Sequence, residues 1–150
     1  MSRRKPVNQM SLKLESRSVN ESFARVAVSA FAAQQDPTVE EISDIKTAVS
    51  EAVTNCIVHA YPESVGDIYI WVGLFDDGLV RIRIRDRGCG IADVRQAMEP
   101  LFTTLGGQRA GVGFAGMESF MDKVRVRSAP NRGSSVTMDK LIKGRGDGQS

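Results

Sequence analysis

Two short stretches of the chain alternate strictly between β-branched aliphatic residues and arginine. They are VRIRIR at 80–85 and VRVR at 124–127. Successive side chains of a β-strand point to opposite faces of the sheet, so this period of two predicts strands with one apolar and one arginine-rich face. The apolar face must pack against a second layer to leave water. The alternation therefore predicts a sheet that is covered on one side.

The arginine-rich face has two interpretations. It either stays in water and keeps an antiparallel sheet soluble, which is the more common arrangement, or it meets an acidic partner. The formal net charge of +2 argues neither for nor against a nucleic-acid partner. Our expectation is that the protein does not bind nucleic acid directly.

Three further segments have the period of a strand. Met10, Leu12 and Leu14 alternate with polar residues, which suggests a short strand near the N-terminus. DIYIWVGLF at 67–75 is followed by a DDG turn, and an NRG turn leads into SSVTMDK at 134–140. These segments complete the predicted sheet.

Two segments have the period of a helix instead. The first covers 18–35 and leaves Arg25 off its apolar face, so we expect that arginine to be exposed. The second begins at Thr38, which fits a capping box with Glu41, and runs to about Tyr61, where a proline follows. The predicted apolar face of the first helix consists of Phe23, Val26, Ala27, Ala30 and Phe31.

The order of these elements predicts the fold class. A short helix is expected near 92–98, a Gly-rich loop at 103–113 and a helix at about 114–121. Two long helices that precede a sheet, with another between its later strands, fit an α+β fold. We expect a two-layer α/β sandwich, with a mixed, mostly antiparallel sheet and helices on one face.

A chain of 150 residues is the size of a single domain. We place that domain at 8–142, after a flexible N-terminus at 1–7 and before a disordered tail at 143–150. No apolar run is long enough to span a membrane and no signal-peptide segment follows the basic start, so we expect a cytoplasmic protein without membrane contact. Cys56 and Cys89 belong to no CxxC pair, and free thiols are expected.

The second helix carries an unusual polar stripe. Between Thr47 and Ala60 the only formal charge is Glu51, and Asn55 lies one turn further on the same face. An amide oxygen suits Mg²⁺, and a nearby carboxylate can accept the proton of an attacking hydroxyl. His59 continues the stripe, but a lone histidine near a helix end more often packs or caps, and it has no assigned role.

DRGCG at 86–90 directly follows a predicted strand. Its glycines allow a close approach of the backbone to a ligand, and Asp86 can accept a hydrogen bond from an exocyclic amine such as that of adenine. The alternative is a plain connection in which Asp caps and Gly turns the chain, and this cluster alone favours that alternative.

A second glycine cluster, RAGVGFAG at 109–116, contains the letters GxGxxG. No strand directly precedes it, so we reject a dinucleotide-binding fold, and the chain has no P-loop motif. Glycines at a helix N-terminus can still offer N–H groups to a phosphate, and Arg109 can bond to phosphate oxygens. A flexible surface loop is the alternative for Gly106 and Gly107.

Taken in chain order, the motifs are Glu-x-x-x-Asn on a helix, Asp-x-Gly-x-Gly after a strand, and a Thr/Gly-rich loop that ends in Gly-x-Gly-Phe. This order resembles the GHKL ATPases, a superfamily that includes gyrases and sensor histidine kinases. Within it, the stretches IKTAVSEAVTNCIVHAY, PLFTT and RAGVGFAGMESFMD resemble the anti-sigma F factors of spore-forming bacteria. The resemblance covers roughly residues 8–142.

This resemblance implies the GHKL (Bergerat) ATP-binding fold and a serine kinase that uses ATP and Mg²⁺. It also implies partners: a sporulation sigma factor of the sigma F type, an anti-anti-sigma factor as the phosphorylation substrate, and a second copy of the chain. Two alternatives stay open. One is a related anti-sigma kinase of a stress-response pathway, and the other is a nucleotide-dependent sigma-binding module without kinase activity.

The resemblance assigns roles to individual residues. It implies that Glu51 is the general base, that Asn55 binds Mg²⁺ and that Asp86 reads the adenine amine. Arg109 is implied to reach the terminal phosphate, and Arg25 to grip protein partners. The other nucleotide-binding residues that it implies are Gly88, Gly90, Thr103, Thr104, Gly111 and Gly113.

Overall fold

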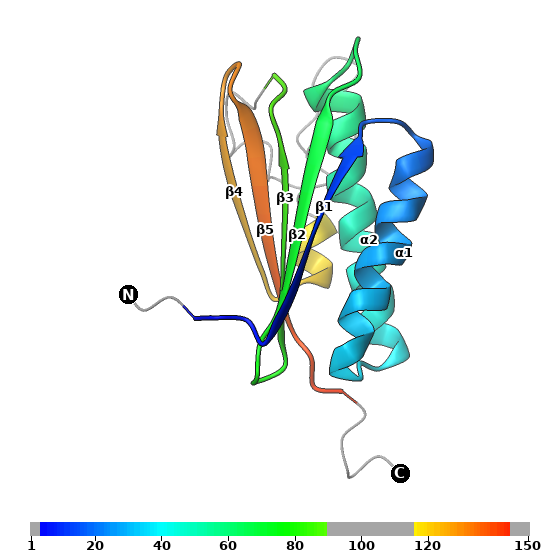
Figure 1. The fold of residues 1–150 in the computed structure, drawn as a ribbon, viewed down its shortest axis with the longest axis vertical. Coiled ribbons are helices and arrows are strands. Elements are labelled where there is room, and N and C mark those ends of the chain that lie inside the picture. The colour runs from blue at the N-terminus through cyan, green and yellow to red at the C-terminus, as the bar shows by residue number, and fades with distance from the viewer. Residues whose placement is uncertain (1–3, 90–115, 145–150) are drawn as a thin grey trace.

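The computed structural model describes residues 4–89 and 116–144. In this part of the chain, five strands form one open sheet in the order β1-β2-β3-β5-β4, and two long helices cover one face of it (Figure 1). The strands are β1 (Asn8–Glu15), β2 (Asp67–Leu74), β3 (Leu79–Asp86), β4 (Lys123–Ala129) and β5 (Gly133–Leu141). The helices are α1 (Val19–Ala32) and α2 (Val39–Asn55), each followed by a short turn of another helical type, Ala33–Gln35 and Cys56–Ala60.

The predicted two-layer α+β fold is confirmed. All four pairings between the described strands are antiparallel. The aliphatic residues of β3 and β5, such as Ile82, Ile84 and Met138, are almost fully buried beneath the helices. The arginines that alternate with them on β3 point to the uncovered face, as the period of two requires.

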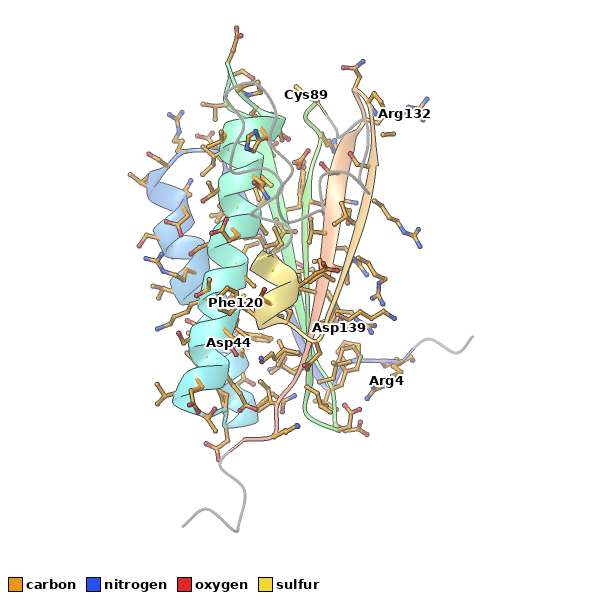
Figure 2. The ribbon with its side chains drawn as sticks, turned by 180° about the vertical axis from the view of Figure 1, so that it is seen from behind. Arg4, Asp44, Cys89, Phe120, Arg132 and Asp139 are labelled. Carbon is orange, nitrogen blue, oxygen red and sulfur yellow. The ribbon has the colours of Figure 1, made fainter. Side chains whose placement is uncertain are left out.

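A short helical segment at 116–120 lies on the same side of the sheet as α2, and it falls within the helix predicted at 114–121. Met117 is fully buried in the shared core. Lys140 of β5 fixes this segment, because its Nζ donates to the Phe120 carbonyl at 2.8 Å and pairs with Asp44 of α2 at 3.0 Å (Figure 2). The part of the prediction at 92–98 and 103–113 lies outside the described residues.

The predicted apolar face of α1 is wrong at Phe23 and Val26, whereas Phe31 packs against the core. The residues that α1 buries are Ala24, Val28, Ser29 and Ala32, whereas Phe23 and Val26 remain 51% and 56% exposed. The physical reason is the close packing of α1 on α2, which favours small side chains at the contact. Phe23 and Val26 are left on the outer side of the helix.

The start of α2 matches its prediction, but its end differs. Thr38 Oγ1 accepts from the Glu41 N–H and the Glu41 carboxylate accepts from the Thr38 N–H, which is the predicted capping box. Regular α-helix ends at Asn55, however, and Cys56–Ala60 forms a π-helical turn. A π-turn holds one more residue per turn, and the sequence pattern alone does not reveal it.

Residues 4–7 and 143–144 fall in the segments predicted to be flexible, yet they contact the domain. The Val7 N–H donates to the Leu74 carbonyl at 2.7 Å, which extends the pairing of β1 with β2. The N–H groups of Lys143 and Gly144 donate to the Glu41 carboxylate at 2.8 and 3.1 Å. None of the described helices is long and apolar enough to cross a bilayer.

Candidate functional site

Asp86 is a buried carboxylate at the end of β3, with only 6% of the residue exposed. Its Oδ1 accepts hydrogen bonds from the N–H groups of Gly88 and Ser134, at 2.9 and 3.2 Å. Its Oδ2 has longer contacts, with the Ser134 hydroxyl at 3.3 Å and the Cys56 thiol at 3.6 Å. Carboxylates are rarely buried without such donors, so these contacts hold Asp86 in one orientation.

The loop after Asp86 lies directly on the end of the π-turn. The Cys89 N–H donates to the Ala60 carbonyl at 3.0 Å, and a Cβ on Gly88 would come within 2.2 Å of the same oxygen. Only glycine permits this approach. The Tyr61 hydroxyl accepts from the Arg87 N–H at 2.7 Å and holds the loop from its other side.

The turn between β4 and β5 completes this support. Gly133 has a φ of 92°, and a Cβ there would lie 2.2 Å from the Asp86 carbonyl oxygen. Asn131 donates its N–H to the Cys89 carbonyl at 2.6 Å. A turn was predicted at this point, but the roles of Gly133 and Ser134 were not, because their contact with Asp86 depends on the register between β3 and β5.

Cys56 joins the end of α2 to Asp86. Burial raises the pKa of its thiol well above the ordinary value of 9.0, and the nearby Asp86 charge and the hydrogen bond to that carboxylate raise it further. The thiol therefore stays protonated and donates to Asp86. Both cysteines are free, as predicted, with Cys56 buried and Cys89 exposed.

Glu51 and Asn55 lie one turn apart on a half-buried face of α2. The side-chain nitrogen of Asn55 is buried and has no hydrogen-bond partner in the described part of the chain. Leaving such a group unpaired costs about 1–3 kcal/mol, which makes it a marker of a ligand or water position. The π-turn begins at the next residue, and such turns are frequent at functional sites.

The amide of Asn55 fits the magnesium and phosphate chemistry expected of it. It can present its oxygen to a hard cation or its nitrogen to a phosphate oxygen, and the Cys56–Asp86 contact brings this end of α2 against the end of β3. Asn55 is therefore the direct chain neighbour of a residue that contacts the Asp86 carboxylate.

Arg25 lies at the junction of α1 and α2. Its Nη1 pairs with Glu21 at 2.9 Å and donates to the Ser50 hydroxyl at 3.2 Å, and 38% of its side chain is exposed. The residue is thus more constrained than the sequence analysis expected. Ser50 directly precedes Glu51 in the chain, so the contact with Ser50 places Arg25 beside the residue next to the predicted base.

The remaining predicted site residues divide into two groups. Gly88, described above, is the first; His59, to which no role was assigned, is half-buried within the π-turn. The others lie outside the described residues, and their assignments stay predictions: Gly90, Thr103, Thr104, Arg109, Gly111 and Gly113.

A helix-covered antiparallel sheet, with a buried aspartate at the end of a central strand and a Glu-x-x-x-Asn helix against it, defines a class of nucleotide-binding domain. A family model described as the histidine kinase-like ATPase domain matches residues 13–140, so the chain belongs to that family. The crystal structure of the RsbU and RsbW domains of a Mycobacterium tuberculosis protein has the same fold. The TM-score is 0.67 at 23% identity, over 91% of this chain and 32% of the other.

Within this class the chain belongs to the anti-sigma F factors. It is 57% identical over 136 residues to the anti-sigma F factor of Caldanaerobacter subterraneus, which covers 90% of this chain and 94% of the relative. The identity is 52% with the anti-sigma F factor of Pasteuria penetrans, over 90% of this chain and 91% of that protein. The identity is 49% with the anti-sigma F factor of Geobacillus thermodenitrificans, over 90% of this chain and 93% of that protein.

Proposed function

We propose that this cytoplasmic protein binds a sigma factor of the sigma F type and keeps it from RNA polymerase. We further propose that it is a serine kinase, which uses ATP and Mg²⁺ to phosphorylate an anti-anti-sigma factor. The family membership and the names of the relatives support the first activity. The geometry around Asp86 supports the second.

The observation that carries the proposal is the unequal bonding of the two Asp86 oxygens. Oδ1 accepts from two backbone N–H groups, at 2.9 and 3.2 Å, whereas the contacts of Oδ2 are 3.3 and 3.6 Å long. A thiol is a weak donor, and the hydroxyl contact is the only other one at Oδ2 among the described residues, so Oδ2 retains the capacity to accept from a better donor. The exocyclic amine of adenine is such a donor.

Glu51 and Asn55 carry out separate tasks in the proposed kinase. The Glu51 carboxylate accepts the proton of the attacking serine hydroxyl, and the Asn55 oxygen holds Mg²⁺. Bound Mg²⁺ supplies charge neutralisation for the phosphates. The contact of Arg25 with Ser50 supports a common partner surface, because a protein held at Arg25 lies near the base.

We also propose that the protein forms a homodimer. Val19, Phe23 and Val26 form an apolar stripe on the outer side of α1, with exposed fractions of 73%, 51% and 56%. Residues at these helical spacings share one face, and a contiguous exposed apolar patch is typical of a protein interface. This stripe supports a contact with a second copy.

The test is to incubate the protein with radiolabelled ATP, a sigma factor of the sigma F type and an anti-anti-sigma factor as its antagonist. Binding of the sigma factor and phosphate labelling of the antagonist are measured separately. We expect Asp86→Asn to lose ATP binding, because one acceptor oxygen of the carboxylate is replaced by the NH₂ group of an amide, which is a donor. Glu51→Gln is expected to bind ATP but to phosphorylate about 10²–10⁴ times more slowly. We expect Arg25→Ala to weaken sigma-factor capture while ATP affinity stays unchanged.

Two results would change the assignment. If the wild-type protein binds ATP and the sigma factor but never labels the antagonist, it is a nucleotide-dependent binding module and the kinase proposal is wrong. If Glu51→Gln labels the antagonist at the wild-type rate, Glu51 is not the base.

A further inference from the structure

The face of the sheet that no described helix covers carries a regular array of cations. The register between β3, β5 and β4 places them in rows, each with a cation on β3, a short side chain on β5 and a cation on β4. Nitrogen-tipped side chains project from this side of the sheet in Figure 2. The three rows are Arg85–Ser135–Arg127, Arg83–Thr137–Arg125 and Arg81–Asp139–Lys123.

The rows form the sides and floor of a channel, which we call the arginine channel. Adjacent strands lie about 4.8 Å apart, so the backbones that carry the facing cations are about 9.6 Å apart. The long side chains of β3 and β4 rise above the short ones of β5. A hollow of about 440 Å³ occupies the Ser135 end, where Arg85, Arg87, Arg127 and Arg132 line it.

Charge is balanced at only one end of the channel. Asp139 accepts from Arg81 through two bonds of 2.8 and 3.0 Å, and Arg125 lies 3.8 Å from the same carboxylate. In the other two rows Ser135 and Thr137 replace the acidic residue. Neither Arg83 nor Arg127 has an ion-pair partner among the described residues. This end therefore presents positive charge that the described sheet does not neutralise.

Aromatic residues of β2 hold two of these arginines in place. The Arg83 guanidinium lies 5.3 Å from the centre of the Trp71 ring, and Arg85 lies 5.1 Å from that of Tyr69. The Trp71 ring also lies over Gly73, where a Cβ would come within 2.4 Å of it. The ring thus already stacks with the Arg83 guanidinium and lies against Gly73, which leaves less of its surface for the stacking of a nucleic-acid base.

The spacing of the rows identifies a matching ligand. Neighbouring rows are two residues apart along β3, or about 6.8 Å. Alternate side chains of an extended polypeptide have the same spacing. Carboxylates on such side chains can each reach a pair of facing arginines, and Arg–carboxylate pairs are often bidentate. A second copy of this face would bring like charges together and is therefore a poor match.

We propose that the open end of the arginine channel binds an extended acidic polypeptide segment with carboxylates at alternate residues. One carboxylate lies between Arg83 and Arg125, and the next lies between Arg85 and Arg127. The hydroxyls of Thr137 and Ser135 donate to them from the floor. The hollow at this end also reaches Asp86 and Ser134, so the peptide site adjoins the proposed nucleotide site. The arginines that bind the peptide lie on the opposite face of the sheet from the helices, and the peptide site does not depend on kinase activity.

The test uses two labelled nonapeptides of identical composition. One alternates serine with four glutamates, and the other has the order Glu-Glu-Ser-Ser-Glu-Glu-Ser-Ser-Ser, which never places two glutamates two residues apart. Fluorescence anisotropy with the intact protein measures both, with a thymidine oligonucleotide as a third probe. We expect the alternating peptide to bind about tenfold more tightly than its isomer and more tightly than the oligonucleotide.

Two variants test the named residues. The double variant Arg83→Gln with Arg127→Gln is expected to lower the affinity for the alternating peptide about a hundredfold. The control, Arg17→Gln with Lys46→Gln, removes the same charge elsewhere and is expected to change that affinity less than about threefold. Thr137→Asp places a carboxylate in an open row, as Asp139 does in the neighbouring one. We expect it to abolish peptide binding while the thermal unfolding transition and ATP binding are retained.

Three outcomes would overturn the proposal. Equal binding of the two peptides shows charge attraction without a matched site. Tighter binding of the oligonucleotide assigns the face to nucleic acid. Absence of binding to any of the probes leaves the channel as a solvated face.

Discussion

Gly88 lets the loop after Asp86 lie directly against the π-turn. The Gly88→Ala side chain would meet the Ala60 carbonyl at 2.2 Å, so the loop must move away from the π-turn. We expect this variant to lose about 1–3 kcal/mol of stability and at least about tenfold in nucleotide affinity, because Asp86 loses the Gly88 N–H. Chemical denaturation and ATP titration measure the two effects.

Gly116→Ala is the matched control, since among the described residues no atom beyond its chain neighbours and its own helix backbone lies within 4 Å of the added Cβ. It lies in the helical segment at 116–120, where alanine is favoured over glycine, and we expect unchanged or slightly raised stability. If both variants bind ATP as the wild type does, the close contact at Gly88 has no role in the site.

The buried thiol of Cys56 makes stability depend on alkaline pH. Its folded pKa is raised above the ordinary 9.0, so near that pH the unfolded chain loses a proton that the folded chain keeps. The free energy of unfolding contributed by this group is complete below that pH and falls as pH rises through and above it. We expect wild type to lose more stability than Cys56→Ala between neutral pH and about pH 10.

The comparison with Cys56→Ala is needed because burial also raises the pKa of Tyr61, so this phenol contributes to the alkaline pH dependence of both proteins. A thiol reagent gives an independent measurement. We expect it to modify Cys89 in the native protein and Cys56 only after unfolding. Equal reactivity of the two thiols would contradict the burial of Cys56.

Sequence analysis identified Asp86 but not the residues that hold it. A carboxylate followed by two glycines after a strand is a local pattern, and it can be read directly. Ser134 lies 48 positions further along the chain, and its contacts arise from the β3–β5 register. The burial of the Asn55 amide was equally inaccessible, because it depends on the packing around the π-turn.

At the scale of secondary structure elements, the start of α2 has a second function beyond capping. The Glu41 carboxylate accepts from the N–H of Thr38 and from those of Lys143 and Gly144, after β5. We expect Glu41→Ala to cost about 2 kcal/mol, more than Thr38→Ala at about 1 kcal/mol. Glu40→Ala, at the exposed neighbouring position, is the control and is expected to have little effect.

The same hydrogen bonds at Glu41 predict that the stability of the protein falls at acidic pH. Burial alone would raise the pKa of Glu41, but the bonds from the N–H groups of Thr38, Lys143 and Gly144 outweigh it and lower that pKa. The stability from Glu41 is therefore present above the ordinary carboxyl pKa and is lost as pH falls through the folded one. Glu41→Gln is expected to show a shallower loss in acid-unfolding curves, and an unchanged slope would contradict this role.

The helices show which part of an element a sequence pattern determines. The period of α1 was predicted correctly, but part of its apolar face was wrong, because α1 buries Ala24, Val28 and Ala32 while Phe23 and Val26 stay exposed. Hydrophobicity cannot distinguish a small residue at a close helix contact from a large one at the surface. The capping box was predicted correctly because it depends only on neighbouring residues.

At the scale of the whole molecule, the outer stripe of α1 predicts the state of association. We expect Phe23→Glu with Val26→Glu to convert a dimer to a monomer, since two charges at a buried contact face are strongly unfavourable. Light scattering coupled to size-exclusion chromatography measures the mass. Val39→Glu is the control, because Val39 is 81% exposed at the start of the other helix. A wild-type monomer would contradict the homodimer.

The two-layer architecture was predictable as a whole because its evidence is repeated along the chain. Each of the described strands and both long helices have their own period, so an error at a single residue does not change the predicted architecture. The arginine face was also predicted, whereas its rows were not. They require the order β3-β5-β4, which brings Arg83 and Arg125 to opposite sides of Thr137.

The strand β3 also constrains how a chain of this kind can change during evolution. Asp86 faces the helix layer, while its neighbours Arg85 and Arg87 face the other side. Substitutions alter these two surfaces one residue at a time, but inserting or deleting one residue within β3 would exchange the faces of every residue beyond it. Differences in length among relatives are therefore expected in the turns, such as that at 76–78, and not within this strand.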